Sequence, residues 1–168
     1  LQALPLTELG DLDHEGHREF HIQELINGKS GEGDQGQLSE WLDESDPDVV
    51  VLYAGQQDVR GGQANNGVLN ELKQVVDQLR AHNPSVRIVV TNVNNHKSST
   101  SINAEIDSYN GYFASNAAAL LTDTAMSPLA LADISNLTIG APGDLWSGTY
   151  PNSSGNTKIA TAIYNALN

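Results

Sequence analysis

A run of apolar residues in the middle of the chain, residues 49–54, constrains the fold more than any other feature. The run is rich in β-branched side chains, follows Pro47 and stops at Gly55. A strand that is apolar on both faces is typical of the interior of a parallel sheet with helices on both sides. Such sheets place their ligand chemistry at the carboxyl ends of the strands. We therefore expect the functional residues to gather around Gln57 and Asp58, which follow this run.

The other apolar residues alternate between strand and helix patterns along the chain. Residues 86–93 and 129–134 predict two further strands, and residues 1–6 predict a short first strand. Apolar side chains at three- and four-residue spacing predict helices over residues 20–27, 38–45, 68–82, 102–121 and 153–167. This alternation indicates one domain over residues 1–168, an α/β fold built as a three-layer α/β/α sandwich with a short, mostly parallel sheet.

Two details concern the carboxyl-terminal part of the chain. Residues 136–152 contain three glycines and are expected to form a long loop. Pro151, Ser153 and Ser154 are expected to cap the last helix.

Composition limits the possible partners. The chain has 21 acidic and 8 basic residues and a net charge of −13. Nucleic-acid binding needs clustered Lys and Arg, which the sequence lacks, so we expect no nucleic-acid partner. The same sign disfavours anionic membranes, and no apolar run of about 18 residues predicts a membrane span. The chain starts at Leu1 and carries glycosylation sequons at Asn136 and Asn152, which favours a processed, secreted protein.

Two patterns near the amino terminus suggest metal binding, and both have simpler interpretations. Residues 11–16 match the start of an EF-hand loop, but its twelfth position is Ile22 instead of the required Glu. His17 and His21 are four residues apart and could hold zinc with an acidic or histidine neighbour. Cysteine is absent, so no thiolate can serve as a ligand or nucleophile. We interpret the segment as a polar turn and expect no metal and no cofactor.

Four segments taken together resemble a known family. Residues 13–17 (DHEGH), 47–58, 144–155 (DLWSGTYPNSSG) and 4–6 are similar in order and type to blocks of the SGNH (GDSL-type) hydrolases. The likeness is strongest to small carbohydrate acetylesterases of the acetylxylan-esterase kind. It implies an SGNH/flavodoxin-like sandwich across nearly the whole chain.

The resemblance also implies a deletion near the amino terminus. The chain is short around Leu9, where the family has its first helix and an edge strand. Their loss would make residues 1–6 the edge of the sheet. A bare edge can pair with a strand from another molecule, so a homodimer through this edge is one expectation.

The positions that match the family's catalytic residues carry other residue types. Leu9 stands at the nucleophilic serine, Glu19 at a glycine that donates its amide to the oxyanion, and Gln57 at the oxyanion asparagine. Ser147 and Tyr150 stand at the aspartate and histidine of the last block. Leu9 has no nucleophilic atom, and a tyrosine with a pKa of about 10 cannot take a proton from an alcohol at neutral pH. We therefore expect no catalytic residues and a catalytically inactive pseudoenzyme.

The expected function is binding of a carbohydrate, another small ligand or a protein partner through the former active-site cleft. The candidate binding residues are Gln57, Asp58, Trp146 and Tyr150. Aromatic rings beside amide and acid groups are typical of a sugar-binding surface, because a ring stacks on the apolar face of a pyranose. The alternatives are that Trp146 packs its loop onto the sheet and that Asp58 fixes loops by hydrogen bonds.

Two other functions stay open on the sequence. One is an esterase or carbohydrate O-deacetylase with a relocated site that uses Ser147 or His96 together with Asp58 or Glu8. The other is a self-assembling or adhesion protein that uses the bare edge strand.

Overall fold

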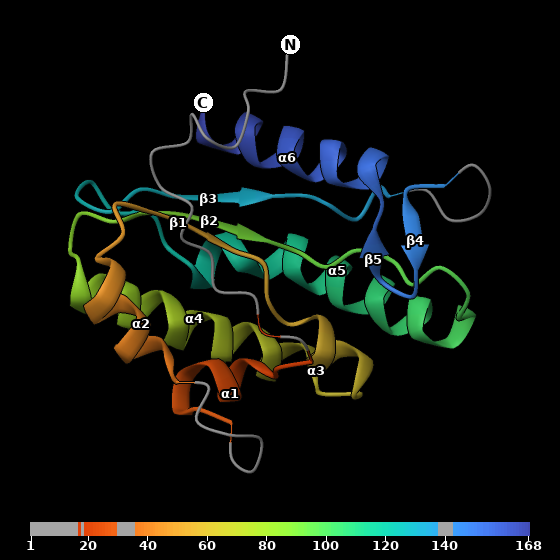
Figure 1. Cartoon of the computed structure of the whole chain (residues 1–168), viewed down its shortest axis with the longest axis horizontal. Helices are drawn as coiled ribbons and strands as arrows, with labels where there is room; N and C mark the ends of the chain where they lie inside the picture. Colours follow the sequence, from red (N-terminus) through yellow and green to blue (C-terminus); the bar gives the residue numbers. More distant parts are fainter. Residues whose placement is uncertain (1–16, 18, 30–35, 138–142) are drawn as a thin grey trace.

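The computed structural model describes residues 17, 19–29, 36–137 and 143–168. Its centre is a parallel sheet of three strands, β1 (Val49–Leu52), β2 (Arg87–Thr91) and β3 (Leu129–Ala132), in the order β1-β2-β3. One helix covers one face of the sheet, and the remaining described helices lie on the opposite side (Figure 1). The predicted α/β sandwich with a short parallel sheet is confirmed.

The described helices follow the predicted apolar patterns closely. They are α1 (Ile22–Asn27), α2 (Leu38–Ser45), α3 (Gln56–Arg60), α4 (Asn65–His82), α5 (Thr100–Leu120) and α6 (Ser153–Leu167). The apolar stripe of α4 is fully buried, as its spacing predicts: Val68, Leu69, Leu72, Val75, Val76 and Leu79. This stripe packs with α5 against β1 and β2 to form the main core. Only α3 was not predicted, because five residues show too little periodicity.

The prediction that β1 is buried on both faces is wrong within the described part of the chain. Val50 and Leu52 face the core, but Val49 and Val51 are 47% and 43% exposed. The reason is the position of the strand: β1 is the edge of the described sheet, and α6 packs over β3 and β2 instead. Residues 1–6, the predicted edge strand, lie outside the described residues.

The predicted long loop over residues 136–152 contains a hairpin of β4 (Leu145–Ser147) and β5 (Tyr150–Pro151). Two residues, Gly148 and Thr149, join the strands, and the φ of Gly148 is +52°. Two-residue hairpin turns need a positive φ at the first central position, which glycine adopts without steric cost. The turn therefore depends on Gly148.

The predicted cap of the last helix is also corrected. Asn152 is the N-cap of α6, and its side-chain oxygen accepts a hydrogen bond from the Gly155 amide at 3.1 Å. Its side-chain nitrogen donates to the Gly143 carbonyl at 2.7 Å. Asn152 is one of the two sequon asparagines, so the nitrogen that a glycan would modify is already used inside the fold. None of the described helices is both long and apolar enough to cross a membrane.

Candidate functional site

A polar network joins the carboxyl ends of β1 and β2 to the β4–β5 hairpin. The Tyr53 hydroxyl donates to the side-chain oxygen of Asn94, and Gln56 Nε2 donates to the Asn94 carbonyl at 3.2 Å. Asn94 Nδ2 donates in turn to the Thr149 carbonyl at 3.0 Å. Burial raises the pKa of Tyr53, so its hydroxyl stays a neutral donor at physiological pH. Asn94 is fully buried and links three separate segments at the edge where a parallel sheet places its ligands.

The hairpin is held through its backbone, which leaves its side chains exposed. The Lys97 amide donates to the Gly148 carbonyl at 2.6 Å, and Lys97 Nζ donates to the Trp146 carbonyl at 2.7 Å. Trp146 is 76% exposed and Tyr150 is 47% exposed. The alternative that Trp146 packs its loop onto the sheet is therefore wrong, since most of its side chain faces solvent.

A β-bulge accounts for the position of Trp146. In the hairpin Leu145 pairs with Pro151 and Ser147 pairs with Tyr150, so Trp146 is the extra residue of its strand. A bulge re-aims the side chain that it carries, and bulges are frequent next to functional sites. No sequence pattern predicted this bulge.

His96 lies beside the turn of the hairpin. Its Nδ1 accepts a hydrogen bond from the Ser98 amide at 3.2 Å, so we assign the proton of the neutral ring to Nε2. Nε2 is 3.6 Å from the point that a Cβ on Gly148 would occupy, and Tyr150 Cδ2 is 4.0 Å from the same point. The imidazole and the tyrosine ring therefore flank the bare backbone of Gly148.

The loop that carries His96 is braced from α5. The His96 amide donates to the Asn103 side chain at 2.6 Å, and Asn103 Nδ2 donates back to the His96 carbonyl at 2.9 Å. His96 is half-buried. It is thus a positioned side chain and not a freely solvated one.

Asp58 has no access to a ligand in this structure. Its side chain is 1% exposed, accepts hydrogen bonds from the Ile22 amide at 3.3 Å and pairs with His21 Nδ1 at 3.1 Å. These contacts fix the start of α1 to α3. The structure therefore places Asp58 in a structural position, the alternative that the sequence left open.

No side-chain hydrogen bond joins the other predicted site residues to one another in the described part of the chain. The side-chain oxygen of Gln57 accepts from Arg60 Nη1 at 3.4 Å on the same helix, whereas the neighbouring Gln56 reaches the polar network. Trp146 and Tyr150 lie on the hairpin and make no hydrogen bond to Gln57. Leu9 lies outside the described residues.

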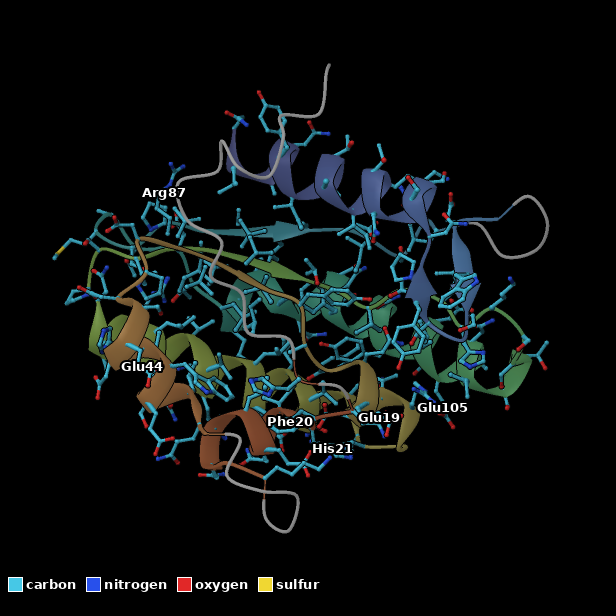
Figure 2. The ribbon with its side chains drawn as sticks, in the orientation of Figure 1. Glu19, Phe20, His21, Glu44, Arg87 and Glu105 are labelled. Atoms are coloured by element: carbon cyan, nitrogen blue, oxygen red, sulfur yellow. The ribbon has the colours of Figure 1, made fainter. Side chains whose placement is uncertain are left out.

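Glu19 and Ser147 are the last two of the predicted site residues. Glu19 is exposed, lies beside His21 (Figure 2) and has a φ of +61°, a backbone conformation that favours glycine. This agrees with the glycine that the resemblance places there. Ser147 is exposed, and neither Ser147 nor Tyr150 forms a hydrogen bond with an imidazole or a carboxylate in the part of the chain that the structure describes.

Gln56 and Asn94 were missed by the sequence reasoning. The signal that could have found Asn94 is the sequence NVNN of residues 92–95, which follows directly after β2. Gln56 was overlooked because the family pattern drew attention to Gln57. Two buried acceptors of this region, Gln56 Oε1 and Asn95 Oδ1, have no hydrogen-bond partner among the described residues.

The described surface has hollows beside α6, β3 and α2. A hollow of about 580 Å³ lies between β3 and α6, and two smaller ones lie beside β3 and between α2 and α4. Gln57, Trp146 and Tyr150 line none of these three. The described residues contain no group of three or more potential metal ligands. His17, a predicted zinc candidate, stacks instead on Phe20 and Trp41 at ring-centre distances of 4.7 and 4.2 Å.

Comparisons with known proteins agree with this fold. Among solved structures, a carbohydrate esterase family 3 protein from Talaromyces cellulolyticus matches with 26% identity and a TM-score of 0.67 over 92% of this chain and 70% of its own. A family 3 carbohydrate esterase from Clostridium thermocellum matches with 23% identity and a TM-score of 0.65 over 96% and 71%. A search of curated protein sequences found no match.

The sequence itself matches a family model over residues 11–158, which is most of the chain. That model describes the GDSL-like lipases and acylhydrolases. The match covers α1 to α5, the whole parallel sheet and the first residues of α6. The chain therefore belongs to the GDSL-like Lipase/Acylhydrolase family.

Proposed function

We propose that this chain is a non-catalytic member of its family that binds a carbohydrate chain through the exposed rings of Trp146 and Tyr150. The observation that carries the proposal is the β4–β5 hairpin. It is anchored by three hydrogen bonds to its backbone carbonyls, and both aromatic side chains project from it into solvent. A rigid support with exposed rings is a suitable platform for a sugar, because little order is lost when the ligand binds.

The residues at the family's catalytic positions support the absence of the family's acyl transfer. Tyr150 replaces the general base, and Ser147, its cross-strand partner, replaces the acid that orients it. A phenol with an ordinary pKa of about 10 does not remove a proton from an alcohol at neutral pH. The hairpin that would deliver a base therefore offers an aromatic ring instead.

The chemistry around the rings favours a polysaccharide over an apolar ligand. A pyranose has an apolar face that stacks on an aromatic ring and hydroxyl groups that need polar neighbours. His96 Nε2 lies next to Gly148 between the hairpin and the loop after β2, within reach of a ligand on Tyr150. The hairpin is open, so it can accept an internal segment of a long chain. Two of the similar solved structures are named carbohydrate esterases, which fits a polysaccharide ligand.

The proposal is tested by co-sedimentation with insoluble xylan, cellulose and chitin and by affinity electrophoresis with soluble xylan. Trp146→Ala and Tyr150→Ala should each weaken binding at least tenfold, while circular dichroism stays unchanged. Tyr164→Ala is the matched control, because Tyr164 is 67% exposed but lies on α6. Its binding should equal that of the unmodified chain. If none of these polysaccharides is retained, the sugar-binding proposal is wrong.

A second candidate is a carbohydrate ester hydrolase with a relocated site. The likeness to the carbohydrate esterase from Talaromyces cellulolyticus favours it, as does the imidazole of His96 beside the hairpin that carries Ser147. Hydrolysis of p-nitrophenyl acetate separates the two candidates. Turnover that disappears in Ser147→Ala and in His96→Ala would replace the binding function with this one. Turnover that survives both changes would come from another site or from a contaminant.

A further inference from the structure

A positively charged side chain is held against the hairpin that carries the exposed rings. Lys97 lies on the loop after β2, is exposed, and donates from Nζ to the Trp146 carbonyl at 2.7 Å. The Lys97 amide donates to the Gly148 carbonyl at 2.6 Å, so both ends of the residue are fixed to the hairpin. The acceptor of Nζ is a neutral carbonyl, and this contact therefore leaves the charge of the ammonium in place.

We propose that the hairpin binds an acidic polysaccharide, one with scattered uronic acids on a neutral backbone, through a contact between a sugar carboxylate and Lys97. This inference rests on the proposed function, because it names the class of polysaccharide that the rings of Trp146 and Tyr150 bind. A sugar stacked on Trp146 brings its substituents close to an ammonium that is bonded to the backbone of the same residue. Hydrogen bonds between an ammonium and a carboxylate are stronger than those between neutral groups.

His96 supplies a second donor further along the hairpin. Its Nε2, to which we assign the proton of the neutral ring, lies 3.6 Å from the point that a Cβ on Gly148 would occupy. Lys97 Nζ and His96 Nε2 therefore lie beside the same stretch of the hairpin, from Trp146 to Gly148. Carboxylate oxygens accept hydrogen bonds, and sugar hydroxyl oxygens do so too. Both donors thus suit a ligand that carries acceptor oxygens on a sugar ring.

The charge near the hairpin differs from the charge of the whole chain. Helices α5 and α6 both begin at the end of the molecule where the hairpin lies (Figure 1), and neither has an acidic residue in its first turn. The amino-terminal end of a helix carries a partial positive charge. Asp144, which precedes β4, pairs with Lys158 at 2.6 Å. These features add to the charge of Lys97 and favour an anionic group on the ligand.

The net charge of −13 limits how densely charged the ligand is. At physiological salt a charge acts over about 8 Å, so a single carboxylate on Lys97 responds mainly to its immediate neighbours. A polymer that is charged at every residue would also extend over acidic parts of the surface, such as the exposed Asp43 and Glu44 of α2. The charge balance therefore favours a polysaccharide whose carboxylates are separated by neutral sugars.

Affinity electrophoresis with one polymer in two forms tests the proposal. The polymer is glucuronoxylan, either native or with its carboxyl groups reduced to alcohols, so that the backbone is the same in both. The unmodified chain should bind the native form about threefold more tightly than the reduced form, which is the size of effect that an exposed ion pair produces. Lys97→Gln should abolish this preference. Lys97→Arg keeps the charge and should keep the preference.

The ratio of the two affinities separates the effect of charge from an effect on structure. If loss of the bond from Lys97 Nζ to the Trp146 carbonyl merely loosened the hairpin, binding of both forms would weaken equally. Lys73→Gln is the matched control, because it removes the same charge from the middle of α4, which packs with α1, α2, α3 and α5. It should leave the ratio unchanged.

The results distinguish this inference from the proposed function. Equal binding of the two forms, or a preference that Lys97→Gln retains, overturns the acidic ligand and leaves sugar binding by the hairpin in place. Tighter binding of polygalacturonate, which is charged at every residue, overturns the requirement for separated carboxylates. If neither form of glucuronoxylan binds, this inference is wrong, and co-sedimentation with cellulose and chitin decides whether the proposed function stands.

Discussion

Two glycines inside helices allow a test in which the structure reverses the usual effect of a substitution. Replacing a helical glycine by alanine normally stabilises a helix by up to about 1 kcal/mol, because glycine loses more backbone entropy on folding. Gly111 in α5 should follow this rule, since a Cβ added there meets nothing within 4 Å. Gly155 in the first turn of α6 should not. Its added Cβ would lie 2.3 Å from the Asp144 carbonyl oxygen and 2.9 Å from Cβ of Pro151.

The neighbours of Gly155 cannot move away easily. The Asp144 carbonyl also accepts the Asn152 amide at 2.8 Å, and the Asp144 side chain is held by Ser154 at 2.8 Å and by Lys158 at 2.6 Å. Overpacking of this kind costs about 1–3 kcal/mol, and the small helix-propensity gain in a first turn does not offset it. We expect Gly155→Ala to lower the free energy of unfolding by about 1–3 kcal/mol.

Urea denaturation followed by circular dichroism measures both changes. Gly111→Ala should raise the free energy of unfolding by about 1 kcal/mol, or the melting temperature by about 2–4 °C for a domain of this size. Gly155→Ala should shift both quantities in the opposite direction. If Gly155→Ala stabilises the protein as much as Gly111→Ala does, Gly155 does not pack closely against Asp144 and Pro151, and the argument is refuted.

The remaining predictions concern two polar groups. The Tyr109 hydroxyl is buried without a hydrogen-bond partner among the described residues, and an unsatisfied buried hydroxyl is costly. Tyr109→Phe should therefore raise the free energy of unfolding by about 1 kcal/mol in urea denaturation; a loss of that size would show that the hydroxyl has a partner. Burial acts to raise the pKa of Asp133, but hydrogen bonds from Ser135 and Asn92 outweigh it and hold the pKa below its ordinary value. Because the folded-state pKa is lowered, the carboxylate stabilises the fold above the unfolded pKa of about 4, and this contribution disappears as the pH falls through the folded pKa. Thermal melts of Asp133→Asn and the unmodified chain should differ at pH 6 and converge toward pH 2; a gap that widens on acidification would contradict the sign.

Much of the fold could be predicted because local periodicity and burial agree in its central elements. The stripe of α4 and the apolar run of β2 bury the side chains that their spacing predicts, whereas β3 is mostly half-buried. Asp58 was also recognised as a possible structural residue, because the resemblance implies that it fixes loops by hydrogen bonds. Its partners in the structure are the Ile22 amide and the His21 ring.

The candidate site was predicted only in part, because its parts come from segments far apart in the chain. Trp146 and Tyr150 could be named from composition, but their exposure depends on how Lys97 and Asn94 hold the hairpin carbonyls. Such contacts join residues about fifty positions apart, and no local pattern encodes them. The sequence also did not show that Gln56, and not Gln57, binds the Asn94 carbonyl. Neighbouring residues of a helix point in different directions, and only the tertiary structure shows which of them faces the network.

The sequence alone predicted five of the six described helices and the three strands of the parallel sheet, because these properties follow from local spacing and residue type. The match of Tyr150 to the position of the family's base is implied only by the resemblance. Only the tertiary structure decided that β1 is the edge of the described sheet with one half-exposed face, that Asp58 is enclosed, and that the hairpin presents its rings to solvent. The sequence of the apolar run of β1 does not show whether another element covers the strand, because burial depends on what packs against a strand and not on the strand itself.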